Sequence, residues 1–204
     1  MSEPADRIVD HYERHASAWD ADRRAAKWHD KPWHDRFVAL LASTASVLDL
    51  GCGSGVPVAQ HLAEHGLNVT GVDSSPSLIS LCRARLPAHE WLVGDMRSLQ
   101  LTRQFAGILA WDSFFHLRPD DQRHMFGVFA HHAAAEAVLM FNSGPSHGEA
   151  IGAYRGDPLY HASLSPEEYR ELLDGIGFEV VAHAVEDWET GGGRTVWLAR
   201  AAKK

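Results

Sequence analysis

Three glycines follow a short apolar run and could hold a nucleotide-like ligand. The run Val47–Leu50 leads into Gly51, Cys52, Gly53 and, one serine later, Gly55. Residues that lack a Cβ let the backbone pass close to a ligand and expose amides at the start of a helix. A tight structural turn has the same composition, so the loop alone does not define the ligand.

A carboxylate stands at the end of the next apolar run, 68–73. Asp73 lies 18 residues beyond Gly55, a spacing at which a carboxylate can accept both hydroxyl hydrogen bonds of a ribose. The alternative is that Asp73 only caps a helix at Pro76. The dinucleotide pattern G-x-G-x-x-G would require glycine at position 56, where the chain has Val56. The spacing therefore disfavours an NAD site.

A later apolar run ends in Trp111, Asp112 and His116. Asp112 and His116 are candidate catalytic residues, because a histidine titrates near neutrality and can take a proton from a phenol, amine or thiol. They could also orient an acceptor, or only hydrogen-bond the turn.

The elements that position these residues follow the pattern of a parallel sheet. From Ser46 onward, apolar β-branched runs alternate with amphipathic stretches, which predicts βα units and a mostly parallel sheet covered on both faces. A turn with Gly191, Gly192 and Gly193 predicts an antiparallel hairpin at the C-terminal end. We expect strands at about 46–51, 68–73, 90–95, 105–112, 135–142, 179–186 and 194–200.

Helix punctuation is clearest near the C-terminus. Ser165, Pro166 and Glu168 form an N-cap, an N1 proline and a capping box, and the apolar stripe after them ends at Gly177. Further helices are expected after Pro57, from Ser75 and Pro76, and around Met125–Ala133.

Two helices are expected before the sheet. Ile8, Tyr12, His15 and Trp19 fall on one face of a helix. A second short helix is expected from Pro32.

Composition narrows the class of protein. With 204 residues, 45% apolar and 23% charged, the chain suits one domain, 1–204. A net charge of −8 without a basic block disfavours nucleic acid and anionic membranes as partners. Two cysteines in unrelated contexts, and no leader-like or membrane-spanning stretch, favour a soluble cytoplasmic protein. Oligomeric state is not predicted.

Fourteen histidines raise the question of a metal. The pairs His11/His15 and His61/His65 have helical ligand spacing. Neither pair has an evident third ligand or forms H-E-x-x-H, so we expect solvated helix faces and no metal site.

Taken together and in order, the segment Val47–Gly55, Asp73 and the segment Val93–Met96 resemble the first three motifs of class I S-adenosylmethionine-dependent methyltransferases. The resemblance covers about residues 46–145. It implies an α/β, Rossmann-like, doubly wound sheet of seven strands in which only the last is inserted antiparallel. It also implies S-adenosylmethionine as cofactor and S-adenosylhomocysteine as product.

The same resemblance implies roles for individual residues. The three glycines would flank the methionine moiety, Asp73 would hold the ribose, and Asp95 with the backbone of Met96 would meet the adenine. Asp49 would orient the loop or the amino group. An adenine amino group needs an acceptor such as Asp95, which agrees with that role. The expected cofactor-binding residues are Tyr12, Trp19, Asp49, Gly51, Cys52, Gly53, Gly55, Pro57, Asp73, Ser74, Ser75, Asp95, Met96 and Trp111.

Two segments outside the motifs are expected to close the site. The N-terminal segment 1–45 resembles the helical lid of many small-molecule members of this family, with 46–204 as the core. Segment 142–164 shows no helical or strand period and is expected to be a substrate-side loop. Tyr160 and His161 are offered as pocket or catalytic residues, with surface packing as the alternative.

The resemblance implies transfer of a methyl group to an O, N or S atom of a small-molecule acceptor. No Asn/Asp-Pro-Pro-aromatic segment follows the fourth strand, which disfavours methylation of nucleic-acid bases. Two alternatives stay open: an NAD-dependent oxidoreductase, and a non-catalytic regulatory protein that binds S-adenosylmethionine.

Overall fold

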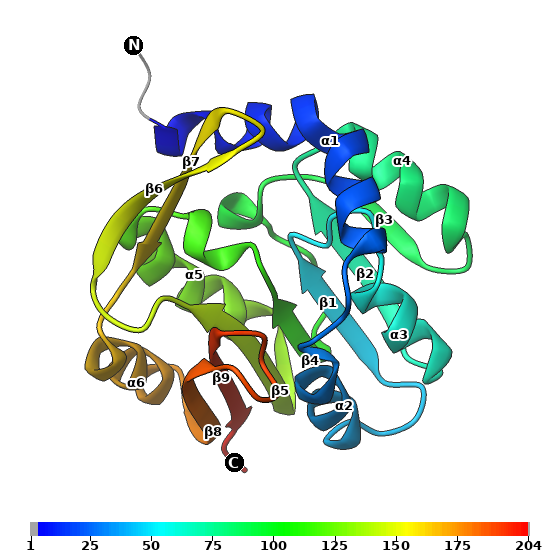
Figure 1. The fold of residues 1–204 in the computed structure, drawn as a ribbon. Helices are drawn as coiled ribbons and strands as arrows, with labels where there is room; N and C mark the ends of the chain where they lie inside the picture. The colour runs from blue at the N-terminus through cyan, green and yellow to red at the C-terminus, as the bar shows by residue number, and fades with distance from the viewer. Residues whose placement is uncertain (1–3, 204) are drawn as a thin grey trace.

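A seven-stranded sheet forms the centre of the protein, whose computed structural model describes residues 4–203 (Figure 1). The strand order is β3-β2-β1-β4-β5-β9-β8. Strands β1 to β5 pair in parallel, and β9 runs antiparallel to both of its neighbours. The Rossmann-like sheet and its C-terminal antiparallel hairpin are therefore confirmed. The strands are Ser46–Leu50 (β1), Asn68–Asp73 (β2), Glu90–Val93 (β3), Phe105–Ala110 (β4), Ala133–Ser143 (β5), Phe178–Asp187 (β8) and Arg194–Ala201 (β9).

Helices cover both faces of the sheet, because the central strands are apolar on both sides. One core joins the sheet to α2, α3 and α4, through side chains such as Phe37, Leu62 and Ile79. The other joins it to α5 and α6, through Phe129 and Tyr169. The helices are Lys31–Ala39 (α2), Val58–Glu64 (α3), Pro76–Arg85 (α4), Pro119–His132 (α5) and Pro166–Gly175 (α6).

The expected helix starts are visible in the capping contacts. The Ser165 side chain accepts a hydrogen bond from the Glu168 amide, and Ser75 does the same for Leu78. Each serine therefore satisfies one of the free amides at the start of its helix. Short 3₁₀ turns at Pro4–Arg7 (η1), Met96–Ser98 (η2) and Phe114–His116 (η3) complete the connections.

The long N-terminal helix α1, Ile8–Ala25, stands apart from these layers. It crosses above the carboxyl ends of the central strands, between α4 and the β6–β7 hairpin (Figure 1). It therefore covers the sheet edge at which ligands of such folds bind.

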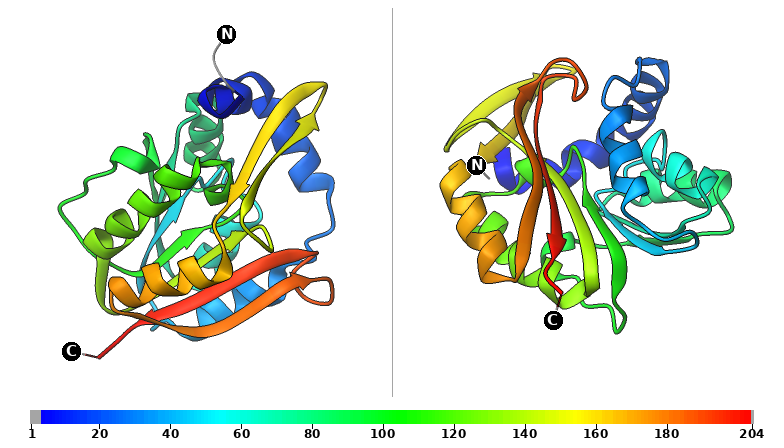
Figure 2. Two further views of the ribbon diagram at one scale, coloured as in Figure 1. Left: turned by 90° about the vertical axis from the view of Figure 1, so that its left-hand side faces the viewer. Right: turned by 90° about the horizontal axis from the view of Figure 1, so that it is seen from below.

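Segment 142–164 corrects the expectation of an irregular loop. Most of it forms an antiparallel hairpin of β6, Gly148–Tyr154, and β7, Asp157–Ser163. The hairpin reaches out from the sheet toward α1 (Figure 2). Nearly all of β6 is exposed, so its sequence lacks the polar and apolar alternation by which half-buried strands are detected.

No helix within residues 4–203 is both long enough and apolar enough to cross a membrane. Cys52 and Cys82 are free thiols.

Candidate cofactor and acceptor site

A cavity lies at the carboxyl ends of β1, β2 and β4, with α1 on its outer side. About 1000 Å³ of space lies between its lining atoms, part of it open to solvent. The expected site residues that line it come from five separate stretches of chain. They are Tyr12, Trp19, Asp49, Gly51, Cys52, Gly53, Asp73, Ser74, Asp95, Met96, Trp111, Asp112 and His116.

Three expected cofactor residues do not line this cavity. Gly55 instead faces Cys82 and Leu86, where a Cβ would lie 3.3 Å from the Cys82 sulfur. Pro57 is the N-cap of α3, and Ser75 is the buried N-cap of α4. The sequence motif predicts the loop correctly, but not which of its residues turn outward.

The glycine loop is held in the shape that the motif predicts. Gly51 and Gly53 have positive φ angles of 76° and 57°, a conformation that favours glycine. A Cβ on Gly51 would lie 2.3 Å from that of Ser113. The Gly51 amide donates to the carbonyl of Val72, which fixes the loop to β2.

Asp73 fastens the same loop at the end of β2. One carboxylate oxygen accepts the Gly53 amide and the other accepts the Ser75 amide, each at 2.9 Å. Burial raises the pKa of Asp73, and the hydrogen bonds from these amides partly offset that rise. Asp73 thus holds the turn before α4, whose N-cap is Ser75, and it also lies on the cavity wall.

Asp49 lines the cavity with a carboxyl group that is not fully hydrogen-bonded. Its side chain is buried, and its Oδ2 has no hydrogen-bond partner among residues 4–203. Burial, followed by the nearby Asp73, raises the pKa of Asp49 to about 7. A buried carboxylate of this kind calls for a cationic partner.

Asp95 is paired with Arg97, which is not among the expected site residues. The Arg97 guanidinium binds both Asp95 oxygens, at 2.6 to 3.0 Å, and lowers the pKa of Asp95. Both residues line the cavity with Met96.

Asp112 is held in an ion-pair network. Arg194 binds its two oxygens at 2.7 Å each, Arg23 approaches to 3.1 Å, and Asn142 donates to Oδ1. Burial alone would raise the pKa of Asp112, but the hydrogen bonds and charge of Arg194 lower it. The carboxylate is therefore ionised and saturated, which makes it a poor proton acceptor.

His116 links α1 to the hairpin. Its Nδ1 donates to the Tyr160 carbonyl at 2.8 Å, so the neutral ring accepts the Tyr12 hydroxyl at Nε2, 2.7 Å away. Burial lowers the pKa of His116 to about 4, which leaves the ring neutral at pH 7.

A second groove adjoins the cavity and shares Asp112 with it. It lies between the base of the β6–β7 hairpin and the β8–β9 turn. His161 lines it, next to Phe115 and against the His116 ring. Tyr160 lines neither space and contributes its carbonyl to His116 instead.

Several cavity residues that carry charge or apolar surface were not expected from the sequence. Arg23 and Arg97 both line the cavity, as does Ile8. Arg97 follows Asp95 by two positions, a spacing that could have indicated an ion pair between them. Arg194 reaches Asp112 across 82 residues of sequence, a pairing that no local spacing reveals.

Comparisons with known proteins agree with this geometry. Residues 47–135 match the methyltransferase domain family. A magnesium-protoporphyrin O-methyltransferase of Rhodobacter capsulatus is 39% identical over 37% of this chain and 35% of its own length. A trans-aconitate 2-methyltransferase of Deinococcus radiodurans is 31% identical over 65% of this chain and 58% of its own. The chain thus spans less than two thirds of either relative.

Solved structures share the fold. A Burkholderia thailandensis 1,6-didemethyltoxoflavin-N1-methyltransferase, crystallised with S-adenosylhomocysteine, superposes with a TM-score of 0.76. It is 20% identical, and the match covers 100% of this chain and 92% of the other. A magnesium protoporphyrin IX methyltransferase from Synechocystis, with bound S-adenosylmethionine, reaches 0.72 at 17% identity over 99% of both chains.

Residues 47–135 thus match the methyltransferase domain family, and the fold is that of solved S-adenosylmethionine-bound methyltransferases. The two solved structures above bind S-adenosylhomocysteine and S-adenosylmethionine, respectively. The cavity fits S-adenosylmethionine, because the orphaned Asp49 carboxyl offers a partner to an ammonium group and the backbone at Gly51 and Gly53 leaves room for close approach.

Proposed function

We propose that this enzyme transfers the methyl group of S-adenosylmethionine to an O, N or S atom of a small-molecule acceptor. The observation that carries the proposal is the adjacency of two spaces. The cofactor cavity and the polar groove meet at Asp112, so a donor in one and an acceptor in the other can approach in line.

The cavity walls suggest how the cofactor is held. Asp49 faces the amino group of the methionine moiety, Asp73 the ribose hydroxyls, and Asp95 with Met96 the adenine. The cofactor itself supplies the activated methyl group on a sulfonium. The chain's part is to bind, to orient and, with α1 as a lid, to exclude water.

Neither candidate base is suited to strong base catalysis. Asp112 is paired with two arginines, and the lowered pKa of His116 makes its ring a weak proton acceptor. We infer that both are positioning residues: Asp112 fixes the arginines at the junction, and His116 fixes Tyr12 and the hairpin. Methyl transfer from a sulfonium needs mainly alignment, so this arrangement suffices.

Cofactor choice is the first test. S-adenosylhomocysteine should raise the melting temperature, because a ligand that binds only the native state stabilises it. NAD should not raise it. A shift with NAD alone would favour the oxidoreductase alternative and overturn the proposal.

Turnover is the second test. Release of S-adenosylhomocysteine should be followed with a panel of small carboxylic acids, amines, phenols and thiols. Trans-aconitate belongs in the panel, because several relatives bear its name. A protein that binds the cofactor but turns over none of these classes would favour the non-catalytic alternative.

A further inference from the structure

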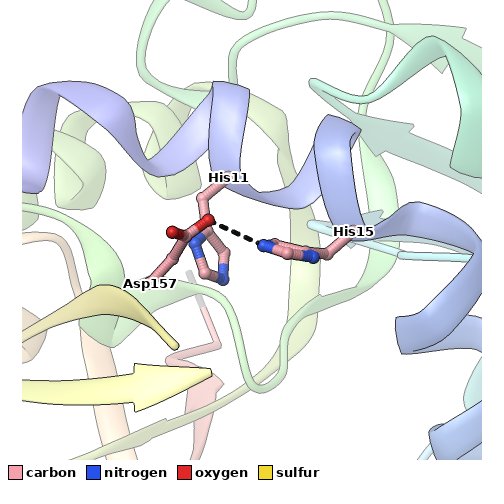
Figure 3. Close-up of side chains that lie close together, drawn as sticks. All are labelled: His11, His15 and Asp157. Atoms are coloured by element: carbon pink, nitrogen blue, oxygen red, sulfur yellow. Dashed lines mark hydrogen bonds and ion pairs between the residues drawn. The ribbon is translucent and has the colours of Figure 1, made fainter. Parts of the chain in front are cut away.

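Three side chains with metal-binding chemistry meet where α1 touches the β6–β7 hairpin. His11 and His15 stand one helical turn apart on α1, and Asp157 begins β7 (Figure 3). One ligand atom from each residue lies within 4.8 Å of the other two. The expectation that this histidine pair lacks a third ligand was therefore wrong. The third ligand is 142 residues away from His15 in sequence.

Of the three residues, His11 has the buried and unpaired ring nitrogen that a ligand could bind. Its side chain is 5% exposed, and its Nε2 is buried without a hydrogen-bond partner among residues 4–203. Its nearest ring neighbours, His15 and Tyr12, lie at centroid distances of 4.9 and 5.5 Å. A buried ring nitrogen left unpaired costs free energy that a ligand would recover.

Asp157 has capacity for one more partner. His15 Nε2 and Arg14 Nη1 both contact its Oδ2, at 2.8 and 2.7 Å. Its Oδ1 makes neither contact. The carboxylate is about one third exposed and His15 about one sixth, so an ion can enter from solvent at the hairpin tip.

We propose that His11, His15 and Asp157 bind a divalent transition-metal ion, with Zn²⁺ as the representative. Two imidazoles and one carboxylate suit Zn²⁺, Co²⁺ or Ni²⁺ and not Ca²⁺ or Mg²⁺, which prefer oxygen ligands. Three protein ligands leave the fourth position of a tetrahedral site to water. None of the three residues lines the cofactor cavity, so the site is distinct from it.

Small movements complete the coordination. Ligand atoms in a tetrahedral site with bonds of ~2.1 Å lie roughly 3.4 Å apart. Separations of up to 4.8 Å must therefore close by about an ångström, and His15 Nε2 and Asp157 Oδ2, now 2.8 Å apart, must open slightly. A neutral His15 moves its ring hydrogen from Nε2 to Nδ1, which frees Nε2 for the metal without a net loss of protons. Arg14, 60% exposed, can withdraw into solvent.

A metal at this position joins two elements that otherwise meet through side-chain contacts. Two ligands come from α1 and one from the hairpin, so the ion cross-links the two. This consequence follows from the location of the ligands and does not depend on which acceptor is methylated.

The test uses the full chain with any affinity tag removed. Titration with Co²⁺ should give ligand-field absorption that saturates at one equivalent, and Zn²⁺ should displace it. Even the loss of an outer partner of a metal ligand typically weakens binding by about tenfold or more. Asp157→Asn and His15→Ala should each weaken Zn²⁺ binding at least that much. Asp157→Asn keeps the shape of a partly exposed side chain, so misfolding should not obscure the result.

Two further variants separate a built site from chance binding. His65→Ala removes one member of the other helical histidine pair and should leave Zn²⁺ affinity unchanged. Arg14→Ala removes a competing cation and should strengthen it. Wild-type binding that equals that of Asp157→Asn would overturn the proposal, as would equal losses in Asp157→Asn and His65→Ala, or no Co²⁺ spectrum in the wild type.

Discussion

Single carboxylates differ sharply in this protein, although several lie at strand ends. The Oδ2 atom of Asp49 is buried without a partner among residues 4–203, Asp73 accepts two loop amides, and Asp112 is ion-paired with Arg194 and Arg23. Their positions could be predicted from the sequence because Asp49 lies within an apolar run, and Asp73 and Asp112 each end one. Their partners could not, since most of them come from distant stretches of chain.

Asp49 should couple cofactor binding to proton release. Its pKa lies at about 7 in the free protein because of burial and then Asp73, and the ammonium group of S-adenosylhomocysteine would favour its ionised form. Affinity should therefore rise with pH by up to about tenfold per unit below pH 7, and level off above it.

Calorimetry of S-adenosylhomocysteine binding at pH 6.5, in buffers with different ionisation enthalpies, measures the released proton. Asp49→Asn should abolish the release and the pH dependence. Asp95→Asn, at the proposed adenine position, should retain both. Proton release that persists in Asp49→Asn would assign it to another group.

Asp73 should matter for affinity more than for folding. Asp73→Ala removes the proposed acceptor for the ribose and also frees the Gly53 amide. Because a hydrogen bond to a charged group contributes about 1.5–3 kcal/mol, S-adenosylhomocysteine should bind about tenfold more weakly or worse. Calorimetry gives the affinity, and a cooperative melting curve shows that the fold is intact. Unchanged affinity would leave Asp73 as a structural cap only.

At the scale of elements, the buried strands could be predicted from the sequence, whereas the exposed β6–β7 hairpin could not. The strands β1, β2 and β4 are buried apolar runs, and their expected positions agree with the structure to within two residues. The hairpin β6–β7 was missed because β6 is exposed and contains Gly148 and Gly152, which carry no side chain to reveal a face. Contacts of α1 likewise depend on the tertiary fold.

Glu13 is the residue that best reports how α1 closes the cavity. Its carboxylate accepts hydrogen bonds from the Ser75 hydroxyl and from both the amide and the hydroxyl of Ser77, at the start of α4. Negative charge is stabilising at a helix N-terminus. Glu13→Ala should loosen α1 and increase the dissociation rate of S-adenosylhomocysteine several-fold in stopped-flow displacement. Asp10→Ala, an exposed acid on the same helix, is the matched control and should leave the rate unchanged.

For the whole molecule, the fold class could be predicted because seven apolar runs and their glycine punctuation are local features. Closure of the site could not, because it depends on long-range pairs such as Tyr12 with His116 and Trp33 with Asp187. These pairs tie the N-terminal helices to the sheet and to its C-terminal hairpin. Residues from distant parts of the chain therefore contribute to the stability of the fold and to its dependence on pH.

Buried neutral histidines should make the protein sensitive to acid. Burial lowers the pKa of His34 and takes that of His116 from 6.5 to about 4. The unfolded chain binds more protons than the native state between these values, so the contribution is complete above pH 6.5 and is lost as pH falls toward 4. His116 alone accounts for about 3 kcal/mol over that range. Asp49 acts in the opposite direction, because its pKa is raised and its protonated form favours the native state below pH 7. Comparison of variants with the wild type at each pH cancels the contribution of Asp49.

Melting temperatures from pH 7.5 to 4.5 should therefore fall less steeply in His116→Gln than in the wild type. His147→Gln, at an exposed position, is the control and should follow the wild type. Parallel curves for the wild type and His116→Gln would show that the acid sensitivity arises elsewhere.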